Sequence, residues 1–176
     1  MKNTTTGFEY DSKEFAKQFH YAGSDLGVRY SPKASAFRVW APAAKAVELL
    51  LFQSGHKKEE PRVVPMAAGA KGTWGVKVEG DLRNQYFQYR LVQPGFPAPV
   101  VAVDPYAEAT GANGARAMIV DLRETDPKGW SQDAMASFSD PVDAIIYEVH
   151  VRDFTIHSSA GSCFPGLYAG MAERET

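Results

Sequence analysis

The chain has 176 residues, of which 44% are hydrophobic and 23% charged, so it can bury a packed core. Nineteen lysine and arginine residues against 21 aspartate and glutamate residues leave a net charge of -2, and no sequence-wide attraction to nucleic acid is expected. No stretch approaches the roughly 20 apolar residues of a membrane span, so we expect no membrane partner either.

The first residues of the chain indicate where the protein works and how it begins to fold. The segment MKNTTTGFEYDSKEF lacks the apolar region of a secretory signal, which favours a cytoplasmic protein. Cys163 is the single cysteine, so we expect no intrachain disulfide and no cysteine metal cluster. We also expect no cofactor. Residues 1–25 form a lead segment in which Ser12 is a candidate N-cap before KEFAKQF, and this predicts one short helix or turn leading into the sandwich.

Residues 26–122 contain short runs rich in β-branched and aromatic residues, separated by glycine and proline turns. Helical periodicity is hard to find there. The predicted strands cover residues 35–41, 46–52, 73–80, 85–92, 100–104 and 117–122. Repeated short strands with turn chemistry between them are typical of an antiparallel, immunoglobulin-like β-sandwich, and this makes the expected fold class mainly β.

Apolar and polar residues alternate in two of these runs, which predicts strands with one dry and one wet face. The expected dry faces consist of Trp74, Val76 and Val78 in one run and of Phe87, Tyr89 and Leu91 in the other.

The composition changes after the predicted sandwich. Residues 123–142 are polar and turn-rich, as in a connector. From Asp143 the run DAIIYEVHV is almost continuously apolar, the pattern of a strand covered on both faces in a parallel sheet. A (β/α)8 barrel takes about 250 residues, so we interpret residues 143–176 as the incomplete start of one. Without neighbouring strands this segment should be exposed and prone to aggregate.

Four polar residues lie on or directly after that predicted strand: Glu148 and His150 share one of its faces, and Asp153 follows at its carboxyl end, where barrel enzymes place their catalytic groups. They are Glu148, His150, Arg152 and Asp153. Because buried charges must be paired, we favour a hydrogen-bonded structural network over a catalytic role for them. A metal site is disfavoured, because Glu148 and His150 have no cluster of further ligands beside them.

Exposed aromatic rings are candidate sugar platforms, because sugars lay their apolar faces against them. The rings considered are Trp40, Trp74, Tyr86, Tyr89 and Phe96. Strand context favours core or half-buried packing for Trp40 and Trp74. Phe96 lies in the loop QPGFPAP and is the best candidate for an exposed ring, although loop anchoring explains it equally well. We name Phe96 and Trp74 as weak carbohydrate-binding candidates.

Several stretches resemble the amino-terminal region of type I pullulanases, which are starch-debranching enzymes of glycoside hydrolase family 13. These stretches are FRVWAPAAKAVELLLF, GDLRNQYFQYRL, VAVDPYAEATGANGARAMIVDL and IIYEVHVRDFT, and the match runs from Leu26 to Phe154. The first motif is shared by many branching and debranching enzymes with a family 48 carbohydrate-binding module. The DPYA and YEVHVRDF motifs point more narrowly to pullulanase.

The resemblance implies hydrolysis of α-1,6-glucosidic linkages in pullulan, amylopectin or limit dextrins, with retention of configuration. In that family the catalytic carboxylates lie on later barrel strands, and none of their motifs occurs in this sequence. We therefore assign no catalytic residue and expect the chain alone to be inactive. Its expected partners are α-glucan and the remainder of the catalytic barrel, as one polypeptide with it or as a separate chain.

The resemblance also bears on sugar binding by the sandwich. Glycogen-binding members of the module family carry tryptophans in two loops that correspond here to residues 53–60 and 93–98, which contain none. We therefore favour a module that packs against the barrel. Two alternatives stay open: a non-catalytic carbohydrate-binding or regulatory module, which exposed tryptophans would favour, and a fragment of a related isoamylase or branching enzyme.

Overall fold

The computed structural model describes residues 9–134, 137 and 139–173. Backbone contacts separate two compact units, Met1–Pro127 and Lys128–Thr176. The borders that the sequence suggested, after residues 25, 122 and 142, stay predictions.

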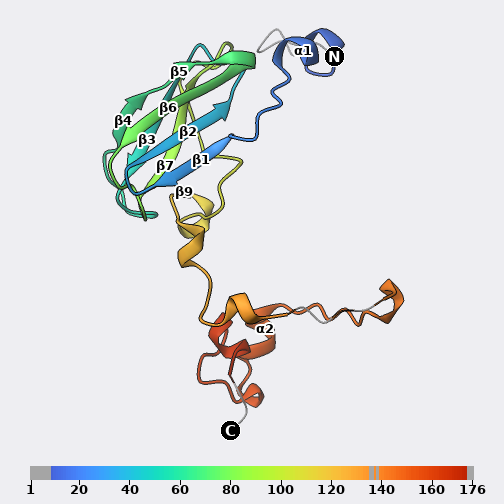
Figure 1. Ribbon diagram of the computed structural model, residues 1–176. Helices are drawn as coiled ribbons and strands as arrows, with labels where there is room; N and C mark the ends of the chain where they lie inside the picture. Colours follow the sequence, from blue (N-terminus) through green and yellow to red (C-terminus); the bar gives the residue numbers. More distant parts are fainter. Residues whose placement is uncertain (1–8, 135–136, 138, 174–176) are drawn as a thin grey trace. The chain divides into compact units, whose positions relative to one another are not determined.

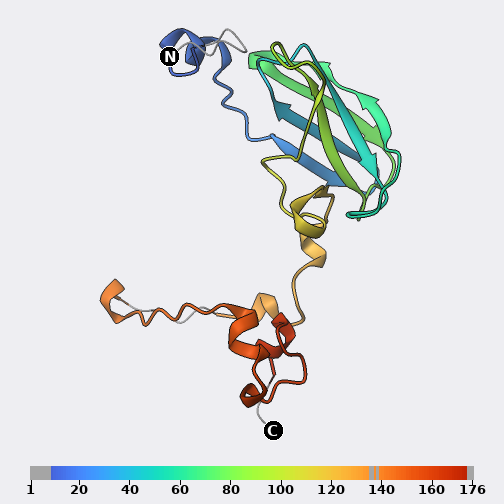
Figure 2. The same cartoon turned by 180° about the vertical axis from the view of Figure 1, so that it is seen from behind.

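The first unit is built from two antiparallel sheets (Figures 1 and 2). One sheet has the spatial order β1 (Gly27–Ser31), β2 (Ala34–Trp40), β6 (Thr73–Glu79), β5 (Ala67–Ala68). The other has the order β4 (Arg62–Pro65), β3 (Ala46–Phe52), β7 (Tyr86–Val92), β8 (Val100–Ala102), and β9 (Ala117–Met118) also pairs with β7. The expected β-sandwich is confirmed.

The core of the sandwich consists of the side chains that both sheets direct inward. Phe37 of β2 meets Phe87 of β7 edge to face, with 5.1 Å between the ring centroids. Phe87, Tyr89 and Leu91 are buried, which confirms the alternation expected in β7. Burying a side chain of this size contributes roughly 1.5–3 kcal/mol, so this layer is the main source of the sandwich's stability.

The structure adds three strands that the sequence analysis missed and shortens two that it predicted. Strands β1, β4 and β5 were not expected, and they lie at sheet edges, where one neighbour suffices. Strand β8 ends at Ala102, and β9 ends at Met118 instead of reaching residue 122. The chain leaves β9 because the Asp121 side chain accepts a hydrogen bond from the Arg123 amide and so caps a 3-10 turn.

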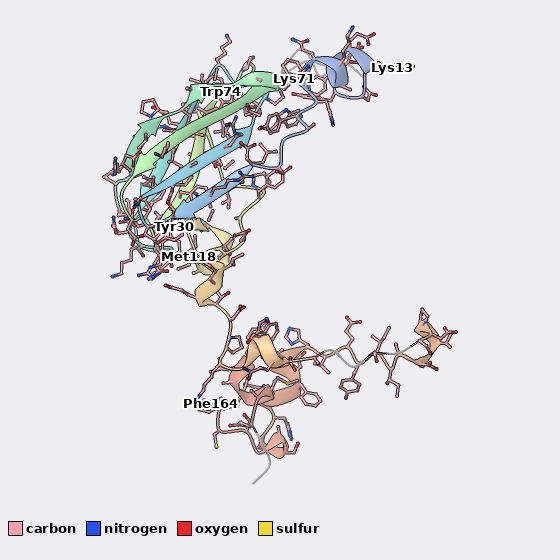
Figure 3. The ribbon with its side chains drawn as sticks, in the orientation of Figure 1. Lys13, Tyr30, Lys71, Trp74, Met118 and Phe164 are labelled. Atoms are coloured by element: carbon pink, nitrogen blue, oxygen red, sulfur yellow. The ribbon has the colours of Figure 1, made fainter. Side chains whose placement is uncertain are left out.

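The lead segment packs against the sandwich as part of the same unit. Helix α1 (Lys13–Phe19) has the predicted bounds, and the Ser12 hydroxyl accepts a hydrogen bond from the Phe15 amide at 3.0 Å, as an N-cap does. Phe15 is buried, and its ring lies edge to face with that of Trp40 at 6.1 Å. Figure 3 shows Lys71 at the end of the sandwich nearest this helix.

Single 3-10 turns supply most of the remaining regular structure. In the first unit they cover Ala70–Gly72 (η1), Ala112–Gly114 (η2) and Leu122–Glu124 (η3). In the second unit they cover Trp130–Gln132 (η4), Pro141–Asp143 (η5), Ser158–Ala160 (η6) and Tyr168–Met171 (η7).

The second unit does not contain the predicted barrel strand, and this corrects the second half of the expected fold class. Residues 144–150 belong to no helix or strand, and Val151 begins helix α2 (Val151–Ile156). Ile145 and Ile146 are 97% and 89% exposed. A strand needs a neighbour to accept its backbone hydrogen bonds, and the described residues of this unit offer none.

Helix α2 is held by its threonine. Thr155 is buried, donates its hydroxyl proton to the Val151 carbonyl at 2.8 Å and accepts from the Gly166 amide at 2.9 Å.

In the described residues no helix has both the length and the apolar surface that crossing a bilayer requires.

Candidate functional site

The four polar residues predicted at the barrel strand are all exposed in the second unit. His150 caps α2: its Nδ1 accepts a hydrogen bond from the Asp153 amide at 3.3 Å and lies 3.4 Å from Asp153 Oδ2. The structure therefore brings His150 and Asp153 together and places Glu148 and Arg152 at the surface. Without a strand to align them, the expected buried network stays a prediction about a larger assembly.

The two sugar-binding candidates lie in different environments. Trp74 is half-buried against the core, and its indole nitrogen donates to the Ala41 carbonyl at 3.1 Å, so it serves packing. Phe96 is 47% exposed in the loop between β7 and β8, as expected of a surface ring. Neither residue lines the two cavities that follow.

The larger of these cavities, which we call the aromatic cleft, was not anticipated. It has a volume of about 530 Å³ and forms where the lead segment meets the sandwich. Its lining consists of Phe19, His20, Tyr21, Leu26, Trp40, Pro105 and Tyr106.

Trp40 is the fixed wall of the aromatic cleft. It ends β2, and its ring is 39% exposed, which corrects the expectation of core or half-buried packing. Its indole nitrogen donates to the carbonyls of Phe19 at 2.9 Å and Lys71 at 3.0 Å. These bonds hold the ring between the lead segment and the turn before β6, so its orientation is set before any ligand arrives.

Tyr106 is the more exposed wall, with 55% of its surface accessible. A buried carboxylate holds its backbone: Asp104 accepts from the Tyr106 amide at 2.9 Å and from the Tyr89 hydroxyl at 3.1 Å. Burial raises the pKa of Asp104, although both hydrogen bonds act to lower it. At Gly27 (φ +96°) a Cβ would lie 3.1 Å from Tyr106 Cβ, so glycine at this position allows Tyr106 to approach strand β1 closely.

A polar cluster lies beside the aromatic cleft. The Tyr21 hydroxyl donates to Asp25, and Asp25 Oδ2 lies 2.9 Å from Arg38 Nε. The hydrogen bond from Tyr21 lowers the pKa of Asp25, an effect that Arg38 strengthens, so this carboxylate is ionised at neutral pH. The Arg38 guanidinium also lies 5.9 Å from the centroid of the Tyr21 ring.

Asp25 and Arg38 also line a second cavity, the polar groove, of about 380 Å³ on the outer face of the β1-β2-β6-β5 sheet. Small residues form its floor and charged residues its rim. Its lining consists of Asp25, Arg29, Ala36, Phe37, Arg38, Ala67, Ala68, Gly69, Gly75, Val76 and Lys77.

This geometry suits recognition of a neutral, hydroxylated ligand. Exposed rings can pack against apolar faces of a sugar, and fixed charged groups can hydrogen-bond its hydroxyls. In the described part of the chain, no three His, Cys, Asp or Glu side chains are grouped so that they could hold a metal ion. The fold and the two cavities together define a β-sandwich binding module.

The comparison with protein families makes this assignment specific. Residues 25–107 match the model of the family described as carbohydrate-binding module 48 (isoamylase N-terminal domain).

The relatives that this chain matches are longer proteins. Pullulanase of Bacillus subtilis is 34% identical over 162 residues, which cover 92% of this chain and 21% of that protein. A pullulanase structure from Paenibacillus barengoltzii, complexed with maltotriose, matches with TM-score 0.88 at 36% identity and covers 98% of this chain and 26% of that one. A structure of pullulanase from Bacillus acidopullulyticus matches with TM-score 0.82 at 43% identity and covers 90% of this chain and 19% of that one.

The expected resemblance to pullulanases is thus confirmed, and the findings are consistent with an amino-terminal pullulanase fragment. The chain spans about a fifth of the curated pullulanase from Bacillus subtilis.

The sequence analysis missed the cleft because its walls come from three separate segments. Two signals were present: the aromatic residues clustered in FAKQFHY of the lead segment, and Tyr106 in the DPYA motif. Neither reveals that Trp40 would lie between them.

Proposed function

We propose that this chain is the amino-terminal, non-catalytic part of a starch-debranching glycoside hydrolase of the pullulanase type. The whole enzyme would cleave α-1,6-glucosidic linkages in pullulan, amylopectin and limit dextrins by a retaining mechanism, which uses a carboxylate nucleophile and a carboxylic acid. Those groups would lie outside this chain, in the remainder of the barrel. The module family of residues 25–107 and the pullulanase relatives support this proposal.

Within that enzyme we propose that the sandwich binds α-glucan at the aromatic cleft. The observation that carries this proposal is Trp40, an exposed ring held by two hydrogen bonds and lining one cavity with the exposed Tyr106. A rigid ring loses little entropy when a sugar packs on it. The cleft volume of about 530 Å³ also falls within the roughly 300–1,000 Å³ of typical ligand pockets.

This proposal revises the packing role expected from the two loops without tryptophan. Those loops are not the ones that line the aromatic cleft, so their composition does not bear on it. The second unit is the better candidate for docking on the remainder of the barrel, because Ile145, Ile146 and Tyr147 expose apolar surface there.

Two assays on the purified 176-residue chain test the proposal. In native gels containing pullulan, binding should retard the chain relative to a gel without polysaccharide. If the chain migrates equally fast with and without pullulan at every concentration, the proposed glucan binding is wrong. In a reducing-end assay the chain alone should release no sugar from pullulan, and measurable hydrolysis would contradict the placement of the catalytic residues elsewhere.

A further inference from the structure

We propose that the polar groove is a second glucan subsite, continuous with the aromatic cleft. The ligand would then be an α-glucan segment of several glucose units that lies across both cavities. This inference rests on the proposed binding of glucan at the cleft. It adds the place where the next glucose units of the same glucan would lie.

The two cavities meet at one hydrogen bond. Tyr21 lines the cleft, Asp25 lines the groove, and the Tyr21 hydroxyl donates to the Asp25 carboxylate. Arg38 lies behind this pair, 2.9 Å from Asp25. A glucan leaving the cleft past Tyr21 therefore reaches the rim of the groove directly.

The floor of the groove is flat because adjacent strands present small residues to solvent. Gly75 of β6 pairs with Arg38 of β2 on one side and with Ala67 of β5 on the other, and Ala36 follows two residues before Arg38 on the same face. No side chain at Gly75 rises above the sheet, so a sugar ring can approach the strands closely.

The rim carries three cationic side chains, Arg29, Arg38 and Lys77, and two of them are paired with carboxylates. Arg38 pairs with Asp25, and Lys77 Nζ lies 2.8 Å from Glu79 Oε1. Arg29 is oriented by a bond from its Nη2 to the Ser24 carbonyl at 2.9 Å. Such a rim offers both donors and acceptors, as hydroxyl groups require, and its two ion pairs leave the charge of Arg29 uncompensated among these groups.

The test measures how affinity depends on the length of the oligosaccharide. Titration calorimetry of the 176-residue chain with maltotriose and maltohexaose should give about tenfold tighter binding of maltohexaose, equivalent to about 1.4 kcal/mol. Gly75→Leu should bring the maltohexaose affinity down to that of maltotriose. A Cβ at Gly75 meets only the Phe37 carbonyl, at 3.5 Å, so the strand accommodates the new side chain and directs it into the groove.

Lys58→Leu is the matched control, because it also adds an exposed leucine, at a residue that lines neither cavity. It should keep the tenfold difference, and thermal melts establish that both variants fold. As an independent readout, maltohexaose but not maltose should shift the amide NMR signals of Ala36 and Ala67.

The outcomes separate the two proposals. Equal affinities for maltotriose and maltohexaose, or a length dependence that survives Gly75→Leu, would overturn the groove subsite and leave glucan binding at the cleft intact. Loss of the length dependence in Lys58→Leu as well would also count against it. Failure of the wild-type chain to bind either oligosaccharide would overturn both proposals.

Discussion

The indole nitrogen of Trp40 donates to the main-chain carbonyl of Phe19 at 2.9 Å, and this bond connects strand β2 to the last residue of helix α1. The same nitrogen also reaches the Lys71 carbonyl, while Lys71 Nζ donates to the Lys17 carbonyl at 2.8 Å. Carbonyls at the end of a helix lack partners within the helix, so the sandwich supplies them here.

Trp40→Phe should loosen the lead segment while keeping an aromatic ring. The carbonyls of Phe19 and Lys71 would lose their donor, at a cost of about 0.5–1.5 kcal/mol in the free energy of unfolding. Urea denaturation gives this value, and hydrogen exchange of the His20 amide, bonded to Ala16, should become faster. Trp130→Phe, at an exposed tryptophan of the second unit, is the control. Unchanged exchange in Trp40→Phe would contradict the anchoring role.

Gly72→Ala should destabilise the chain more than Gly80→Ala does. Both glycines have positive φ, so alanine at either costs about 1–2 kcal/mol of backbone strain. At Gly72 the new Cβ would also lie 2.6 Å from Pro42 and 3.1 Å from Phe19, whereas at Gly80 it meets nothing within 4 Å. We expect an extra loss of about 1–3 kcal/mol at Gly72. Equal unfolding midpoints for the two variants would show that the close contact is relieved without cost.

Tyr106→Ala should weaken maltotriose binding with little effect on stability. The ring is 55% exposed, while the bond that its amide donates to Asp104 does not depend on the side chain. Loss of one stacking ring is worth about 0.5–1.5 kcal/mol, or up to roughly tenfold in affinity. Tyr168→Ala, at an exposed tyrosine of the second unit, should bind like the wild type in the same titration. A parallel loss in both variants would argue against a specific role for the cleft.

Asp104→Asn should change how stability depends on pH. Burial raises the pKa of Asp104 in the folded chain above its unfolded pKa of about 3.9. Its contribution to the free energy of unfolding is therefore fully present below the unfolded pKa and is lost as pH rises through the folded pKa. The unfolding free energy of the wild type relative to Asp104→Asn should therefore fall as pH rises.

Asp121→Asn provides the contrast for that measurement. Hydrogen bonds from Arg123 lower the pKa of Asp121, so its stabilising contribution is present above the unfolded value and is lost as pH falls. Urea titrations between about pH 2.5 and 7 should give slopes of opposite sign for the two comparisons, each variant against the wild type, with the Asp121 slope at the acidic end of this range. Slopes of the same sign would contradict the assigned environments.

The parts of the fold that the sequence predicted are those decided by local pattern. Strand β7 follows from alternation, β3 from a short run of β-favouring residues and helix α1 from the Ser12 cap, since each depends on residues close together in the chain. The edge strand β1 was missed because its sequence, GVRYS, contains one glycine and alternates only weakly.

The binding site could not be predicted in the same way, because it depends on contacts between distant segments. Trp40 and Phe19 are 21 residues apart, and the Tyr106 ring joins them only through the fold of the whole unit. The predicted strand at residues 145–151 failed for a related reason: its pattern was that of a strand buried between neighbours, and the described chain does not provide them. The expected cytoplasmic location stays a prediction.

Helix α1 has seven residues, whereas isolated helices shorter than about 12–15 residues are marginal in water. Its terminal carbonyls find donors in Trp40 and Lys71, which are made later during synthesis than the helix itself. The lead segment therefore leaves the ribosome before β2 and the turn before β6, and its helix gains these two contacts only after both are in place. The cleft is complete only when the lead segment, the end of β2 and the segment that carries Pro105 and Tyr106 have come together.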